Sequence, residues 1–269
     1  MLRWLQVRGC RFYPSLVDAS VKNLLEYCEL NPKVKLRIKD KLIQNFFLEK
    51  TIIDSASSLI KPASFFPYSF VRMKESLRKH HDFPSLIVLV YHVSGFTLLI
   101  DLISIAILED TTKDIVILYG LVNLSRVSKL KETWVQSKRL HFIPNDRNGL
   151  LSLRHHLRKG AIILALIDSP QEKTTSNILP AKLMNHSVFL KTGILRLAAT
   201  FDIPILSVSH YLCRCQLVYK LYPILRLGKE ELHEPEVLKD TLEDLLQPLS
   251  AIIQEYPEQW LLWHKLITE

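Results

Sequence analysis

Short runs of apolar residues alternate with longer amphipathic segments from residue 85 onward. The runs SLIVLVYH, DIVILYG, LHFIP, AIILALID and IPILSVSHY have the length of strands. Between them, FTLLIDLISIAILED and GLLSLRHHLRKG have the length and spacing of helices. Because the runs are almost wholly apolar, they are typical of a parallel sheet that helices cover on both faces. We therefore predict an α/β fold with a mixed, largely parallel central sheet flanked by helices.

The first 60 residues lack such strands and predict helices instead. Apolar residues recur at helical spacing in LVDASVKNLLEYCEL and in KLRIKDKLIQNFFLEKTIIDSASSLI, and an Asn-Pro pair separates the two segments. Residues 62–84, rich in proline and aromatic residues, predict an irregular connection or a short helix. We expect all 269 residues to form a single domain, with a helical part at 1–60 and an α/β core at 61–269.

The last hundred residues predict fewer strands. We expect a loop up to residue 185, then one helix over SVFLKTGILRLAATFD. Two strands follow, IPILSVSHY and LCRCQLVYKLYPIL. The segment EVLKDTLEDLLQPLSAIIQEYPEQWLLWHK is expected to close the chain as a single helix.

The formal net charge of +8 suits an anionic partner such as a phospholipid surface, an acidic carrier protein or a nucleotide-bearing thioester. An ordinary solvated surface fits the charge equally well. The densest basic stretch surrounds Trp134, and it either meets phosphates or an acidic carrier or forms a solvated helix face. Its basic residues are Lys129, Lys131, Lys138 and Arg139. We expect no nucleic-acid partner.

The sequence also bears on the compartment. The four cysteines, Cys10, Cys28, Cys213 and Cys215, form no C-x-x-C pair, so neither a zinc ribbon nor a thioredoxin-type redox site is indicated. No secretory signal is recognisable at the N-terminus, and no stretch reaches the ~20 apolar residues of a spanning helix. We expect a cytoplasmic protein, or one that is peripheral on the inner face of the cell membrane.

Two polar residues follow apolar runs and are the first candidates for chemistry. His92 comes directly after LIVLVY, and Asp168 ends AIILALID. Sheets of this class bind ligands at the carboxyl ends of their strands, and a neutral imidazole there can act as a general base. From position alone, His92 could equally be a structural histidine and Asp168 a turn cap.

Other kinds of site have less support. The adjacent pairs His80-His81 and His155-His156 point about 100° apart on a helix, so neither forms a ligand set by itself. We therefore predict no metal site and no bound cofactor. The chain has no G-x-S-x-G elbow and, with seven glycines, no glycine-rich phosphate loop.

Four segments follow one another in a recognisable order. They are LIVLVYHVSGFTLL, GLLSLRHHLRKGAIILALIDSPQ, KTGILRLAATFDIPILSV and EYPEQWLLWHK. Together they resemble the bacterial lipid A biosynthesis acyltransferases, the lauroyl and myristoyl transferases, within the wider lysophospholipid acyltransferase superfamily. The resemblance covers roughly residues 25–265.

This resemblance implies an enzyme that moves a fatty acyl group from an acyl carrier protein or coenzyme A thioester to a hydroxyl or amine. The acceptor would be a lipid or glycolipid at a membrane surface. In that family a histidine acts as base, and an acid five residues later orients it. His92 matches the histidine, but position 97 is Thr97, which can hold the ring by a hydrogen bond without stabilising its positive charge. Asp168 is the expected substitute acid.

The chain departs from the family in further ways. It shows no N-terminal membrane anchor, and the aromatic-glycine patch after the strand-end aspartate is represented only by LPAKLMNH. The alternative to an enzyme is a non-catalytic relative that binds lipid or an acyl carrier, and the threonine at position 97 is its main support.

Overall fold

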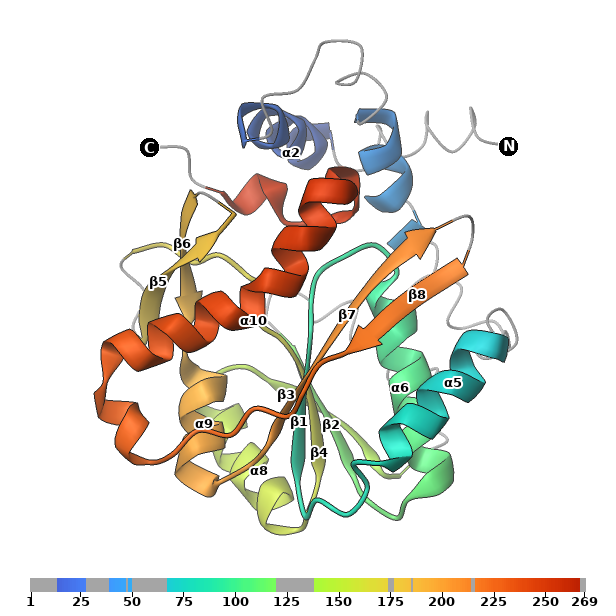
Figure 1. The fold of residues 1–269 in the computed structure, drawn as a ribbon, viewed down its shortest axis with the longest axis vertical. Coiled ribbons are helices and arrows are strands. Elements are labelled where there is room, and N and C mark those ends of the chain that lie inside the picture. Colours follow the sequence, from blue (N-terminus) through green and yellow to red (C-terminus); the bar gives the residue numbers. More distant parts are fainter. Residues whose placement is uncertain are drawn as a thin grey trace.

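A six-stranded sheet forms the centre of the computed structural model, with strand order β3-β2-β4-β1-β7-β8. Strands β3, β2, β4, β1 and β7 run parallel to one another, and β8 runs antiparallel to β7. The predicted α/β class with a mixed, largely parallel sheet is confirmed (Figure 1). The structure describes residues 14–27, 39–46, 48–49, 67–119, 138–173, 177–184, 186–213 and 216–266.

Helices and strands alternate along most of the described chain. In order they are α2 (Pro14–Tyr27), α5 (Pro67–Arg78), β1 (Leu86–Val90), α6 (Phe96–Asp110), β2 (Ile115–Tyr119), β3 (Leu140–Pro144), α8 (Arg147–Arg158), β4 (Ile162–Leu166), β5 (Ile178–Leu183), β6 (His186–Lys191), α9 (Gly193–Phe201), β7 (Ile205–Cys213), β8 (Gln216–Leu221) and α10 (Pro235–Glu255). Short 3-10 turns span Glu230–His233, Pro257–Gln259 and Trp263–Lys265. Most of the basic stretch between β2 and β3 lies outside the described residues.

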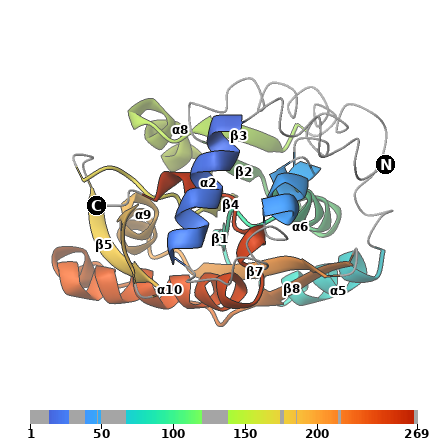
Figure 2. The same ribbon diagram turned by 90° about the horizontal axis from the view of Figure 1, so that it is seen from above.

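Strand β1 is buried on both faces, which explains its continuous apolar sequence. Ile87 and Leu89 belong to the core that α8, α9 and α10 cover, whereas Val88 and Val90 belong to the core under α5 and α6. Successive residues of a strand point to opposite faces, so a strand between two helical layers must be apolar at every position. Figure 2 shows α9 and α6 on opposite sides of the sheet.

The structure differs from the sequence-based prediction at residues 178–191. A loop and the start of a helix were expected there, but β5 and β6 form an antiparallel hairpin in which Leu183 pairs with His186. Its buried face, with Ala181 and Val188, joins the core beside α10. The helix begins only at Gly193, in α9. Burial against α10 therefore decides that these residues form strands.

The predicted closing helix is also too long. Helix α10 ends at Glu255, because Tyr256 precedes Pro257 and takes a non-helical backbone with φ −134° and ψ 63°. A residue before proline is sterically disfavoured in the helical region. The chain after Tyr256 is therefore free to leave the helix and return to the sheet.

Helix α2 lies across the upper end of the sheet in Figures 1 and 2. The amide of Asn23 donates hydrogen bonds of 2.7 Å to the carbonyls of Trp263 and Leu266, which ties this helix to the C-terminal segment. The described residues 39–46 are also helical, in agreement with the predicted helical N-terminal part. Within the described part of the chain, every helix is too short or too polar to pass through a bilayer.

Candidate active site

His92 and Asp168 follow two neighbouring parallel strands. Strands β1 and β4 pair in register, with Leu86 opposite Ile162 and Val90 opposite Leu166. His92 and Asp168 each come two residues after the end of their strand, and hydrogen bonds join them. The structure therefore unites these two predicted site residues at the carboxyl end of the sheet, where this fold class binds ligands.

The imidazole of His92 contacts the carboxylate of Asp168 directly. His92 Nδ1 and Asp168 Oδ1 are 2.8 Å apart. Because an ionised carboxylate can only accept hydrogen bonds, Nδ1 carries a proton toward it, and in the neutral form of the ring Nε2 therefore has the free lone pair. Nε2 has no hydrogen bond to any described residue, and the His92 side chain is 20% exposed while that of Asp168 is fully buried. The ring thus presents a proton acceptor outward.

The carboxylate of Asp168 is held from more than one side. The backbone N–H of His92 donates to Asp168 Oδ1 at 3.1 Å and to Oδ2 at 2.9 Å, and the indole Nε1 of Trp260 donates to Oδ2 at 2.8 Å. Burial by itself raises the pKa of this carboxyl, but the His92 charge and the donated hydrogen bonds outweigh it and lower the pKa of Asp168. Asp168 therefore stays ionised at neutral pH.

Trp260 reaches the site because the C-terminal segment pairs with the turn that carries His92. Val93 and Trp260 form an antiparallel bridge, the N–H of Ser94 donates to the carbonyl of Gln259 at 2.8 Å, and the N–H of Leu261 donates to the carbonyl of His92 at 2.9 Å. These bonds fix the turn backbone and the indole in one unit.

The same segment is anchored to the surrounding elements. The side-chain amide of Gln259 accepts from the N–H of Leu212 and donates to its carbonyl, both at 2.8 Å. From the N-terminal helical part, Asn45 donates to the carbonyl of Glu258 at 2.7 Å, and Lys41 lies 3.0 Å from its carboxylate. The candidate site is therefore built from the sheet, the C-terminal segment and the N-terminal helices together.

Two further histidines surround the turn and are neutral at physiological pH. Burial lowers the pKa of His210 to about 4, although its hydrogen bond to the Val93 carbonyl opposes the shift. Burial and the charge of Lys265 lower the pKa of His264 to about 4. His92 therefore has no cationic histidine beside it at neutral pH.

One lysine lies at the rim of the site. Lys265 Nζ donates to the hydroxyl of Ser169 at 2.8 Å, directly after Asp168 in the chain. Desolvation lowers the pKa of Lys265, and the charge of Asp168 acts in the opposite direction. The ammonium of Lys265 and the buried carboxylate of Asp168 therefore attract each other.

Thr97, the third predicted site residue, is not hydrogen-bonded to the His92 ring. It is in the first turn of α6, is buried, and makes no hydrogen bond to His92, although both residues are described. The structure thus places Asp168, and not Thr97, against the ring nitrogen.

The basic residue Arg139 donates to the carbonyls of Thr111 and Leu108 at the end of α6.

A buried acid pair lies one turn further along α6. Asp101 is buried, and desolvation together with the negative charge of Glu49 raises its pKa well above the usual value of 3.8. Glu49 accepts a hydrogen bond from the N–H of Gly95, at the start of α6. Asp101 is therefore a neutral core group at low to moderate pH rather than a partner of His92.

The role of Trp260 at the site is not predicted by its local sequence. Its motif, P-E-Q-W, was singled out only as part of the resemblance, and a single helix was expected there. The one available signal was the proline at position 257, which predicts a helix end and a new chain direction. Nothing local in the sequence shows that this indole meets Asp168, which lies 92 residues away.

The arrangement has the components of a general base. A carboxylate holds one ring nitrogen, which fixes the tautomer and stabilises the positive charge that forms when the other nitrogen takes a proton.

Comparison of the chain with known protein families finds no matching family, and comparison with curated proteins finds no relative.

Proposed function

We propose that this protein is an acyltransferase in which His92 is the general base and Asp168 holds and charge-stabilises its ring. It would transfer a fatty acyl group from an acyl carrier protein or coenzyme A thioester to a hydroxyl or amine of a lipid or glycolipid. The observation that carries the proposal is the 2.8 Å contact between His92 Nδ1 and Asp168 Oδ1, with Nε2 left free.

The proposed reaction needs only one base. His92 Nε2 takes the proton of the acceptor O–H or N–H as the oxygen or nitrogen attacks the thioester carbonyl. The C–S bond then breaks, and the imidazolium returns its proton to the leaving thiolate, so the products are an ester or amide and a free thiol. Asp168 remains ionised throughout and stabilises the imidazolium.

The resemblance to the lipid A acyltransferases supports this assignment. Of the four segments that carry the resemblance, the first supplies His92, the second Asp168 and the fourth Trp260. Residues from three of these segments, far apart in the chain, therefore meet at one point.

The absent acid at position 97 does not count against catalysis in this arrangement. Asp168 approaches His92 from the neighbouring strand and supplies the negative charge that Thr97 cannot. The net charge of +8 also suits an acidic carrier protein or coenzyme A as donor, and a membrane surface as the place of the acceptor.

The test is thiol release from acyl carrier protein and coenzyme A thioesters, with a cell lipid extract as the acceptor. The wild type, His92→Ala and the control His233→Ala, which removes an exposed histidine far along the chain, are compared. We expect release that depends on the extract, persists in His233→Ala and is lost in His92→Ala. Release that is absent in the wild type, or equal in all three proteins, would support the non-catalytic binding protein instead.

A further inference from the structure

A second group of polar side chains lies at the end of the sheet where the parallel strands begin, opposite the end that carries His92. Asp114 directly precedes β2, His141 is the second residue of β3, and His156 is in the last turn of α8. Strands β2, β3, β4 and β1 are parallel, so their amino ends all lie at one end of the sheet. His92 lies beyond the carboxyl end of β1, at the other end of the sheet. This group is therefore separate from the candidate active site.

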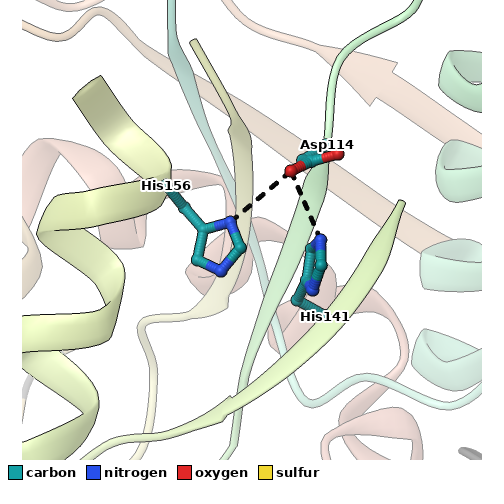
Figure 3. Close-up of side chains that lie close together, drawn as sticks. All are labelled: Asp114, His141 and His156. Atoms are coloured by element: carbon teal, nitrogen blue, oxygen red, sulfur yellow. Dashed lines mark ion pairs between the residues drawn. The ribbon is translucent and has the colours of Figure 1, made fainter. Parts of the chain in front are cut away.

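The three side chains converge on one point. Asp114 Oδ2 is 3.3 Å from His141 Nε2 and 3.6 Å from His156 Nδ1, and the three ligand atoms lie within 4.8 Å of one another. Figure 3 shows both rings turned toward the same carboxylate oxygen. The ring centroids are 4.3 Å apart, with 42° between the ring planes.

These contacts are not hydrogen bonds. His141 Nε2 and His156 Nδ1 are both buried from solvent, and neither has a hydrogen-bond partner. A buried polar atom without a partner costs about 1–3 kcal/mol of stability in general, so two such atoms aimed at one carboxylate need an explanation. Ligands at ~2.0–2.1 Å from a tetrahedral metal ion lie ~3.3–3.5 Å apart, close to the separations from Asp114.

We propose that Asp114, His141 and His156 bind a divalent transition-metal ion, and that the ion is zinc. Two imidazoles and one carboxylate are a donor set that zinc favours. The side chains of Asp114 and His141 are 30% and 32% exposed and that of His156 is 14% exposed, so the site lies close enough to the surface for a water molecule to become the fourth ligand when the ion binds.

The backbone around the site is already fixed. The N–H of Ile115 donates to the carbonyl of Arg139 at 2.8 Å, and the N–H of Ile162 donates to the carbonyl of Asp114 at 2.9 Å. A bound ion would join β2, β3 and α8 at the edge of the sheet.

The experiment uses the untagged full-length chain, stripped with a chelator and then titrated with zinc chloride by calorimetry. Cobalt(II) chloride is the second probe, because its visible absorption reports tetrahedral coordination. The variants are His141→Ala, His156→Ala and Asp114→Asn. The matched control is His155→Ala, which removes the exposed histidine next to His156 in the same helix. His92→Ala controls for binding at the candidate active site.

We expect the wild type to bind one equivalent of zinc, to show cobalt bands of tetrahedral type and to melt at a higher Tm with the ion. Each of the three ligand variants should bind zinc more than about 100-fold more weakly and lose the Tm increase. His155→Ala and His92→Ala should bind zinc and cobalt(II) as tightly as the wild type does and keep the Tm increase. The cobalt spectrum and the Tm increase do not depend on acyl transfer, so the two proposals are tested separately.

The proposal would be overturned by a wild type that binds no zinc, in which case the three side chains form only an ion-paired cluster. It would also be overturned if His141→Ala bound zinc as tightly as the wild type, or if His155→Ala lost binding to the same extent. Circular dichroism of each apo variant shows whether it is folded. A ligand variant that is folded and still binds as the wild type decides against the site.

Discussion

The indole N–H of Trp260 donates a 2.8 Å hydrogen bond to Asp168 Oδ2, the oxygen that does not hold the His92 ring. Both side chains are buried, so the bond is shielded from water. Trp260 is therefore expected to act as a positioning residue: it keeps the carboxylate ionised and aimed at His92 without contacting a substrate.

Trp260→Phe keeps most of the ring and removes the donor. We expect a loss of about 1–3 kcal/mol in the free energy of unfolding, because a buried charged oxygen loses a partner. We also expect the pKa of Asp168 to rise, and because Asp168 and His92 form an interacting pair, the acid limb of the pH–rate profile should move to higher pH. Urea unfolding and thiol release against pH measure the two effects.

Trp263→Phe is the matched control for that variant. Its Nε1 donates 2.7 Å to the backbone carbonyl of Pro257 and not to Asp168. It should lose stability to a similar extent while its acid limb stays at the wild-type position. An equal shift of the limb in both variants would show that the effect is only structural.

Asp168→Asn removes the charge while nearly keeping the shape. An amide has one accepting oxygen for donors from His92 and Trp260, and it cannot stabilise an imidazolium. We expect kcat to fall by about 10²–10⁴-fold with little change in KM, by analogy with the acid of a serine-protease triad.

Because the folded-state pKa of Asp168 is lowered, its contribution to stability is present at neutral pH and is lost as the pH falls through that pKa. Asp168→Asn should therefore lose stability at pH 7 and little at acid pH, and unaltered kcat would contradict the proposed role.

Thr97→Glu restores an acid five residues after His92. The Thr97 side chain is buried and His92 Nδ1 already contacts Asp168, so we expect no gain in kcat. Burying an unpaired carboxylate should instead lower the free energy of unfolding by several kcal/mol, or leave the group protonated. Thr97→Gln has the same size without the charge and separates overpacking from charge burial. An increase in thiol release in Thr97→Glu alone would mean that the family position, rather than Asp168, orients the ring.

Asp101→Asn should stabilise the protein at neutral pH. Burial and the charge of Glu49 raise the pKa of Asp101 above its unfolded value of 3.8, so the folded state holds a proton that the unfolded state releases. Wild-type stability therefore falls as the pH rises from 3.8 through the folded-state pKa, and Asp101→Asn removes this loss. Thermal unfolding of both proteins from pH 4 to pH 8 measures it. A gain that is the same at both ends of the range would rule out titration of Asp101 as the cause.

Gly95→Ala should destabilise the turn that follows His92. Gly95 has φ 85°, a left-handed conformation, and an added Cβ would lie 3.4 Å from the Leu212 side chain. We expect a loss of about 1–2 kcal/mol in the free energy of unfolding. Gly193→Ala is the control, because it is the first residue of α9, has no left-handed φ, and its Cβ would meet nothing within 4 Å. It should be neutral or gain up to about 1 kcal/mol, so equal losses in the two variants would contradict this reasoning.

Much of the fold could be predicted because the central strands carry their burial in their own composition. LIVLV, IVILY and IILAL are apolar at every position, and this pattern fits few structures other than a strand between two helical layers. The hairpin of β5 and β6 could not be predicted in this way. Its strands are half exposed, and their inner face is defined only by contact with α10.

The candidate site was partly predictable for the same reason. His92 and Asp168 stand out because each follows an apolar run, and strand ends meet at one edge of a parallel sheet. The pairing of His92 with Asp168 could be put forward from the sequence only as a hypothesis, since the pairing of β1 with β4 depends on the sheet order. His156 illustrates the limit: beside His155 in the sequence it suggested no ligand set, and its partners Asp114 and His141 come from two other elements.

The sequence by itself determined the α/β class, the ends of the central strands and the two polar residues that follow them, because hydrophobic burial and backbone preference act on neighbouring residues. Only the tertiary structure decided that Asp168, and not Thr97, meets the His92 ring, that Trp260 holds the carboxylate, and that Asp114, His141 and His156 converge. The physical reason is that side-chain contacts depend on strand order and register, and these are set by the packing of the whole sheet against its helices rather than by any short segment.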